Sequence, residues 1–163
     1  MIKNKKILVT GGAGTVGCNI VKKLVDRDAE VTVIDNLSAY PFDYLKDYGV
    51  GDISAVNFVK GDITDKNLMD NLIQKQDIVI HAAALADVGA CVRNPEIEFQ
   101  TNVVSTQGIL EASKKNNIEK FEQAIIDIDN VENEISNILN NNSKLNLINW
   151  YSDDPSILNI EFW

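Results

Sequence analysis

The sequence predicts an α/β protein built on a doubly wound parallel sheet. Short apolar, β-branched segments alternate with segments whose apolar residues recur at helical spacing, over roughly the first 120 of the 163 residues. A glycine-rich turn stands where the first predicted strand meets the first predicted helix. Strands that alternate with helices require right-handed crossovers, which place helices on both faces of the sheet. The expected strand order is 3-2-1-4.

The expected elements follow in regular order. Continuous apolar or β-branched runs predict strands at 5–10, 30–35, 56–60 and 77–81. Apolar residues at helical spacing predict a helix over 16–26 and a second one that Asp65 opens. A long helical stretch is expected from Pro95 to about residue 116, and a loop with a short helix over 36–52.

The remainder of the chain differs in composition. Residues 121–163 hold eight acidic side chains and one basic side chain, which accounts for −7 of the net charge of −9. Apolar residues on one helical face predict an amphipathic helix over about 121–140, followed by extended segments at 145–151 and 157–163. We therefore divide the chain into a unit over 1–121 and a divergent acidic tail over 122–163.

The bulk composition excludes several classes of protein. An acidic chain is a poor partner for nucleic acid or for an anionic membrane. No apolar run approaches the roughly 20 residues that span a bilayer, and the apolar run at 7–9 is too short for a signal peptide. One histidine and two distant cysteines, Cys18 and Cys91, predict no metal site. A cytoplasmic location is expected.

The glycine-rich turn predicts a phosphate site. Gly11 allows the strand to turn sharply, Gly14 removes a Cβ from the path of a phosphate, and Gly17 lets the helix approach the sheet. The backbone N–H groups of Thr15 and Val16 open the helix and offer partial positive charge to a pyrophosphate. Strand before and helix after are the context that a dinucleotide-binding turn requires.

Asp35 ends the second predicted strand, 18 residues after Gly17. A carboxylate at this point accepts hydrogen bonds from the adenosine ribose hydroxyls and repels a 2′-phosphate, so NAD is favoured over NADP. The alternative is that Asp35 only caps the loop that follows its strand.

Five motifs, in order along residues 1–121, resemble those of the extended short-chain dehydrogenases/reductases. Within them the chain is most similar to the UDP-glucose 4-epimerase branch of the NAD-dependent epimerase/dehydratase family. The motifs are Thr10–Gly17 (TGGxGxxG), Asp35-Asn36-Leu37-Ser38 (DNLS), Gly61-Asp62-Ile63 (GDI), His81–Ala84 (HxAA), and Asn94-Pro95 followed by Asn102 (NP…N). The chain departs from the family at Ser105-Thr106, where Gly-Thr is usual, and at Ala86, where many epimerases carry lysine.

The resemblance implies a Rossmann half-domain that binds NAD. It places the Asp62 carboxylate and the backbone after it against the adenine, a loop of small residues against the cofactor, and Asn102 beside the central strands. It leaves His81 as a structural residue rather than a proton donor. The predicted cofactor residues are Gly11, Gly14, Thr15, Val16, Gly17, Asp35, Asn36, Ser38, Asp62, Ile63, Ala82, Ala83, Ala84 and Asn102.

The family's chemistry requires a tyrosine four residues before a lysine, because the lysine lowers the phenol pKa. The four tyrosines, at 40, 44, 48 and 151, are followed at that spacing by Tyr, Tyr, Asp and Pro. The resemblance also stops near residue 121, where a fusion, frameshift or truncation of the gene is one hypothesis. We expect an NAD-binding portion of a nucleotide-sugar epimerase or dehydratase that is inactive alone. The alternative is a non-catalytic interaction module, including a homo-oligomer whose exposed sheet edge and apolar surface drive association.

Overall fold

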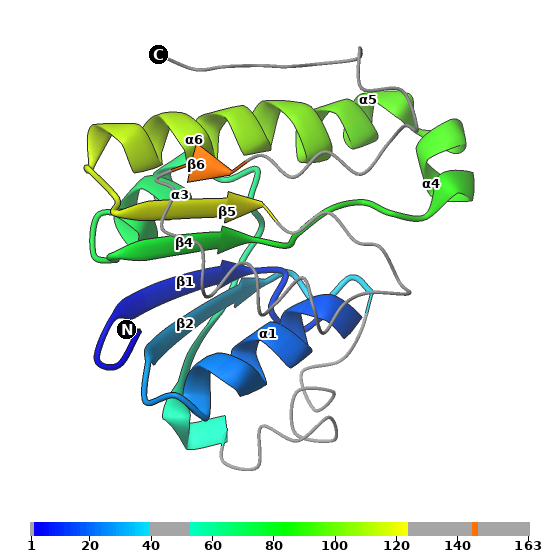
Figure 1. Ribbon diagram of the computed structural model, residues 1–163. Coiled ribbons are helices and arrows are strands. Elements are labelled where there is room, and N and C mark those ends of the chain that lie inside the picture. The colour runs from blue at the N-terminus through cyan, green and yellow to red at the C-terminus, as the bar shows by residue number, and fades with distance from the viewer. Residues whose placement is uncertain (1, 40–52, 124–144, 147–163) are drawn as a thin grey trace.

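The computed structural model describes residues 2–39, 53–123 and 145–146. Strands and helices alternate as the sequence predicts (Figure 1). The first half comprises β1 (Lys6–Thr10), α1 (Thr15–Val25), β2 (Glu30–Asp35), the 3₁₀ turn η1 (Ile53–Ala55), β3 (Val56–Lys60) and α3 (Lys66–Ile73). The second half comprises β4 (Ile78–His81), α4 (Val88–Arg93), α5 (Pro95–Glu98), the π-helix η2 (Phe99–Val104), α6 (Ser105–Lys115), β5 (Lys120–Gln123) and β6 (Leu145–Asn146).

The strands form one sheet in the order β3-β2-β1-β4-β5-β6, and every neighbouring pair is parallel. The predicted order 3-2-1-4 is therefore confirmed, and two further strands extend the sheet beyond β4. The fold is the predicted doubly wound α/β fold of Rossmann type.

The structure has a strand, β5, where the sequence predicted the start of a helix. The helix predicted over about 121–140 does not begin at Phe121, because residues 120–123 pair with β4 in the register Val79 to Phe121. Phe121 is 2% exposed and packs in the core, so tertiary packing decides the conformation of this short segment. Residues 124–140 of the predicted helix lie outside the described residues. β6 falls at the start of the extended segment predicted over 145–151.

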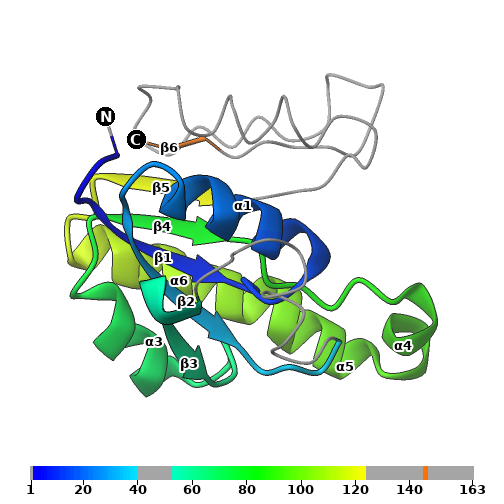
Figure 2. The same ribbon diagram turned by 90° about the horizontal axis from the view of Figure 1, so that it is seen from below.

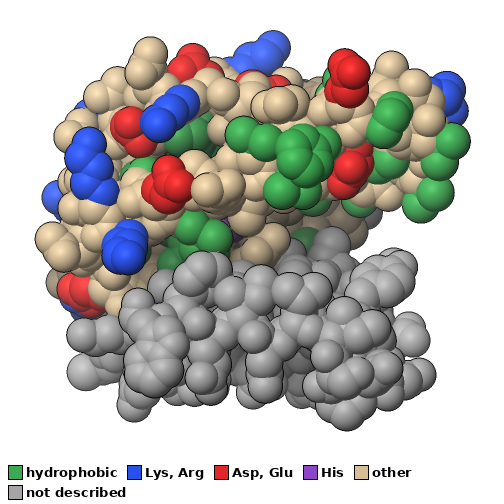
Figure 3. All heavy atoms as spheres, turned by 90° about the horizontal axis from the view of Figure 1, so that it is seen from above, with side chains coloured by type: hydrophobic (Ala, Val, Ile, Leu, Met, Phe, Trp, Pro, Cys, Tyr) green, Lys and Arg blue, Asp and Glu red, His purple; other side chains and the backbone are tan. Residues whose placement is uncertain are grey.

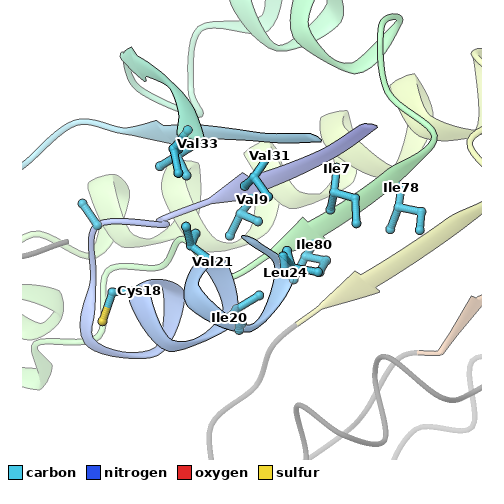
Figure 4. Close-up of a cluster of buried hydrophobic side chains, with 12 residues drawn as sticks. Ile7, Val9, Cys18, Ile20, Val21, Leu24, Val31, Val33, Ile78 and Ile80 are labelled. Atoms are coloured by element: carbon cyan, nitrogen blue, oxygen red, sulfur yellow. The ribbon is translucent and has the colours of Figure 1, made fainter. Parts of the chain in front are cut away.

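Helices cover both faces of the sheet, which the two ribbon views show as three layers (Figures 1 and 2). Alternate residues of each strand face opposite sides. One core cluster joins α1 to the face that carries Ile7, Val9 and Ile80 (Figure 4). The second joins α3 and α6 to the face that carries Leu8 and Val79.

Side-chain caps explain where two helices begin. The Asp65 carboxylate accepts a hydrogen bond from the N–H of Leu68 at 3.0 Å, so α3 opens where the sequence predicts. The sequence did not predict the short helix α4. The Asp87 carboxylate caps this helix by accepting a hydrogen bond from the N–H of Ala90. The long helical run from Pro95 is confirmed, with a π-helical segment at its centre.

Large apolar side chains are exposed along α4, α5 and η2, on a face where Figure 3 shows apolar side chains gathered. We call these residues the apolar stripe: Val88, Val92, Ile97, Phe99, Val103 and Val104. Within the ranges described, no helix combines the length and apolar character that crossing a bilayer requires.

Candidate cofactor-binding site

The candidate site lies at the carboxyl edge of the sheet. Because all strands are parallel, the ends of β1, β2, β3 and β4 meet at this edge, with Thr10 beside Ile34 and His81, and Asp35 beside Lys60. The strand order reverses between β1 and β4, since β2 continues to one side of β1 and β4 lies on the other. Ligands of open α/β sheets bind at such a switch point.

Gly11 makes the sharp turn out of β1. Its φ is +66°, a left-handed conformation that side chains disfavour. A Cβ on Gly11 would also lie 2.7 Å from the Cα of Ala83, so the turn passes directly against the backbone after β4. The N–H of Gly11 donates to the carbonyl of Ile34 at 2.8 Å, which fixes the turn to β2.

Gly17 and Gly14 are required for different reasons. A Cβ on Gly17 would lie 2.0 Å from the carbonyl oxygen of Gly11, so only glycine lets α1 approach the turn this closely. A Cβ on Gly14 would meet only that same oxygen, at 3.3 Å. The packing of the protein therefore demands glycine at position 17 far more than at position 14.

The amino end of α1 presents unpaired donors at this edge. Gly14 occupies the N-cap and offers no side chain to cap the helix. The first N–H groups of a helix, here those of Thr15, Val16 and Gly17, have no intrahelical acceptor. The Thr15 side chain is exposed and Val16 packs partly against the first core cluster. This end can accept an anion, since the helix dipole adds partial positive charge.

Asp35 is held rigidly between the glycine turn and the loop after β2. Its two carboxylate oxygens accept the N–H of Ala13 at 3.0 Å and the N–H of Leu37 at 2.8 Å. Leu37 takes a φ of +61°, which is unusual for a residue other than glycine. The loop-capping contact of the alternative interpretation is thus present, and it fixes the carboxylate beside the turn.

Asn36 and Asp62 connect the ends of β2 and β3. The Asn36 amide donates to Asp62 at 2.9 Å, and its oxygen accepts the N–H of Ser38 at 2.9 Å. Burial opposes ionisation of Asp62, but hydrogen bonds from Thr64 and Asn36 outweigh it, so the pKa of this carboxyl lies below its usual value. Asp62 is therefore an anionic acceptor on a half-buried surface, while Asn36 and Ser38 are exposed.

The remaining predicted residues divide between the core and the loop after β4. The Ile63 side chain is buried in the second core cluster, which leaves only its backbone for a ligand. Ala82 and Ala83 are half-buried and Ala84 is exposed, so these small side chains form a shallow wall beside the turn. The N–H of Ala82 donates to the carbonyl of Thr10 at 3.1 Å, which fixes the start of the loop.

The Asn102 side chain holds this loop through hydrogen bonds to Leu85. Its amide oxygen accepts the N–H of Leu85 at 2.8 Å, and its amide nitrogen donates to the carbonyl of Leu85 at 3.0 Å. The same nitrogen donates to Glu98 at 3.1 Å. The two contacts with Leu85 position the loop, and the contact with Glu98 ties Asn102 to α5. Asn102 itself lies in the π-helix η2.

His81 is buried under the site with 1% of its surface exposed. Its Nδ1 lies 2.6 Å from the Thr10 hydroxyl and its Nε2 lies 2.9 Å from the Thr106 hydroxyl. Burial lowers the pKa of His81 to about 4, which keeps the imidazole neutral near pH 7. Thr10 and Thr106 were not among the predicted cofactor residues, although Thr10 opens the TGGxGxxG motif and Thr106 stands in the Ser105-Thr106 pair that follows Asn102.

The fold and this constellation match a known family. Residues 7–125 match the model of the NAD dependent epimerase/dehydratase family, and the chain belongs to that family. A dTDP-glucose 4,6-dehydratase from Mycobacterium tuberculosis is 41% identical over 116 residues, covering 69% of this chain and 34% of the relative.

Solved structures of epimerases share the fold of this chain. A UDP-glucose 4-epimerase from Thermotoga maritima, solved with UDP-glucose, has a TM-score of 0.65 and 32% identity, covering 72% of this chain and 37% of that one. A UDP-glucose 4-epimerase from Thermus thermophilus in complex with NAD has a TM-score of 0.62 and 32% identity, covering 71% and 36%. The chain spans about a third of the length of the curated relatives it matches (34–36%).

Proposed function

We propose that this chain is the NAD-binding portion of a nucleotide-sugar epimerase or dehydratase. One observation carries the proposal: the amino end of α1 has no side-chain cap, because Gly14 occupies the N-cap, and the fixed carboxylate of Asp35 binds the turn just before it, at the N–H of Ala13. A Cβ on Gly14 would meet one protein atom, the carbonyl oxygen of Gly11 at 3.3 Å, and glycine also keeps a side chain away from the exposed end of the helix. A pyrophosphate over the helix and a ribose beside the carboxylate fit this arrangement.

The proposed contacts follow from the donors and acceptors at the sheet edge. The N–H groups of Thr15, Val16 and Gly17 donate to the pyrophosphate. Asp35 accepts from the ribose hydroxyls, with Asn36 and Ser38 on the exposed side of the same loop. Asp62 and the Ile63 backbone contact the adenine, and Ala82–Ala84 line the cofactor where Asn102 holds their loop. When bound, NAD supplies a hydride acceptor.

Replacement of one carboxylate tests this assignment. Asp35→Ala removes the ribose acceptor and should weaken NAD binding by roughly 1–3 kcal/mol in calorimetric titration. Asp26→Ala is the matched control, because it makes the same charge change at the C-cap of α1, at the other end of that helix. Equal NAD affinity for the two variants would refute the role of Asp35.

We further propose that the chain performs no epimerisation alone. None of its four tyrosines is followed by lysine at the required spacing, so no residue pair of the printed sequence supplies the phenolate of the family's chemistry. The purified chain, given NAD and UDP-glucose, should form no UDP-galactose above the enzyme-free background. Turnover of UDP-glucose would contradict this proposal and point to another base.

A second candidate function is protein association, in the first instance with a second copy of this chain. The apolar stripe favours it, because large apolar side chains exposed on one face mark interaction sites. The helical run that carries most of the stripe begins with Glu96 and Glu98 and ends with Lys114 and Lys115, so an antiparallel copy would oppose unlike charges. Light scattering should then show a dimer that Val103→Glu dissociates and that Gln74→Glu, at the C-cap of α3, leaves intact. A monomeric wild-type chain would exclude this candidate.

A further inference from the structure

A continuous chain of hydrogen bonds runs through the core beneath the proposed cofactor site. It begins at the N–H of Ala83, which donates to the Thr10 hydroxyl at 3.2 Å. It continues from Thr10 through both nitrogens of His81 to Thr106. Thr106 then donates to the carbonyl of Asn102 at 2.8 Å. The residues lie on β1, β4, α6 and η2, so the chain ties four elements together.

The direction of every bond in this chain is determined. The Thr106 hydroxyl has one hydrogen, which it donates to Asn102, so it must accept from His81 Nε2. Nε2 therefore carries the imidazole proton and Nδ1 accepts from the Thr10 hydroxyl. Thr10 in turn accepts from Ala83. Only the neutral imidazole with its proton on Nε2 satisfies all of these groups at once.

Both ends of the chain act on the same loop. One end holds Ala83 through Thr10, and the other is Asn102, whose side chain holds the N–H and carbonyl of Leu85. Ala83 is also the residue against which Gly11 packs, with 2.7 Å between its Cα and a Cβ built on Gly11. The position of the loop and the shape of the glycine turn are thus set by one network.

Among the described residues, no charged side chain hydrogen-bonds to His81, Thr10 or Thr106. His81 is covered by the Thr10 side chain from β1, Thr106 from α6, and the Phe121 ring from β5, whose centroid lies 6.4 Å from that of the imidazole. None of these groups titrates near neutral pH. Burial is the cause of the low pKa of His81.

We propose that His81 is a positioning residue, which in its Nε2–H form couples Thr10 to Thr106 and so holds the loop 83–85 in the shape that receives the dinucleotide. The inference rests on the proposed NAD site. Its consequence is that Thr106, which contacts the imidazole nitrogen opposite the one that Thr10 contacts, controls NAD affinity through His81. Removal of the Thr106 hydroxyl leaves the Nε2 proton of His81 without an acceptor. The hydrogen bonds that hold Ala83 and Leu85 are weakened as a result.

Variants of the 163-residue chain test this coupling. Thr106→Val keeps the shape without the hydroxyl and should weaken NAD binding about fivefold, whereas Thr106→Ser should stay within about twofold of wild type. Ser113→Ala is the matched control, because Ser113 is a buried hydroxyl on the same helix with no hydrogen-bond partner, and should bind like wild type. Nitrogen NMR of the single histidine should show the Nε2–H tautomer in wild type and an altered imidazole environment in Thr106→Val.

The outcomes separate this inference from the proposed function. A wild-type chain that fails to bind NAD overturns the proposed function itself. A wild-type chain and Thr106→Val that bind NAD equally, or an imidazole protonated on Nδ1, overturn the coupling while the NAD site stands.

Discussion

Gly17→Ala should destabilise the folded chain by about 4 kcal/mol or more, which is a large part of the stability of an ordinary domain. The added Cβ would lie 2.0 Å from the carbonyl oxygen of Gly11 and 2.6 Å from the Cα of Gly12. Both are backbone atoms, so α1 must move away from the turn and from the core that Val21 and Leu24 form with the sheet. Urea denaturation followed by circular dichroism measures the loss.

Gly108→Ala is the matched control for this substitution. Gly108 lies inside α6, and a Cβ there meets no atom within 4 Å, so alanine should stabilise the helix by up to about 1 kcal/mol. Gly14→Ala, in contrast, should leave the chain folded and reduce NAD affinity. Equal stability of Gly17→Ala and Gly108→Ala would contradict the close approach of α1 to the turn.

The titration of His81 alone should lower the free energy of unfolding by about 2 kcal/mol as the pH is lowered from 7.5 to 5. Its pKa is about 4 when folded, against the ordinary value of 6.5, so the unfolded chain binds the proton first. The stabilisation that neutral His81 contributes to the folded chain is present above about pH 6.5. It is lost progressively as the pH falls from 6.5 towards about 4. Urea denaturation of wild type at pH 7.5, 6.5, 5.5 and 5 measures the decline.

His81→Gln isolates this effect from other titrations. Burial raises the pKa of Glu122 above its ordinary value, so protonation of Glu122 stabilises the folded chain as pH falls and opposes His81. The pKa of Asp62 lies below the ordinary value of a carboxyl, so Asp62 titrates below the range from pH 5 to pH 7.5. The difference in stability between wild type and His81→Gln should therefore shrink from pH 7.5 to pH 5. A difference that does not change with pH would contradict a buried neutral imidazole.

Sequence periodicity predicted most of the fold because each element carries its own pattern. The β-branched runs of β1 and β2 and the capped start of α3 at Asp65 can be recognised locally. β5 could not be recognised in this way. Its residues Lys120–Gln123 contain one apolar side chain, and they form a strand because β4 pairs with them and Phe121 fills the core. Helical spacing from Phe121 onward therefore favoured the wrong element at this point.

The candidate site was predictable where one short segment determines the geometry. The glycine turn is such a segment, and Asp35 follows it at the spacing that is typical of a dinucleotide-binding site. The hydrogen bond from Asn36 to Asp62 spans 26 residues, and that between Thr10 and His81 spans 71. Contacts of this kind follow from sheet order and register, so sequence patterns alone do not give the role of Thr10 or Thr106.

The central claim is that the carboxyl edge of this sheet binds NAD. Calorimetric titration of the purified chain with NAD, and in parallel with NADP, tests it most directly. We predict saturable binding of one NAD per chain and clearly weaker binding of NADP, because the fixed carboxylate of Asp35 repels a 2′-phosphate. Absence of saturable NAD binding by a folded chain, or tighter binding of NADP, would contradict the account.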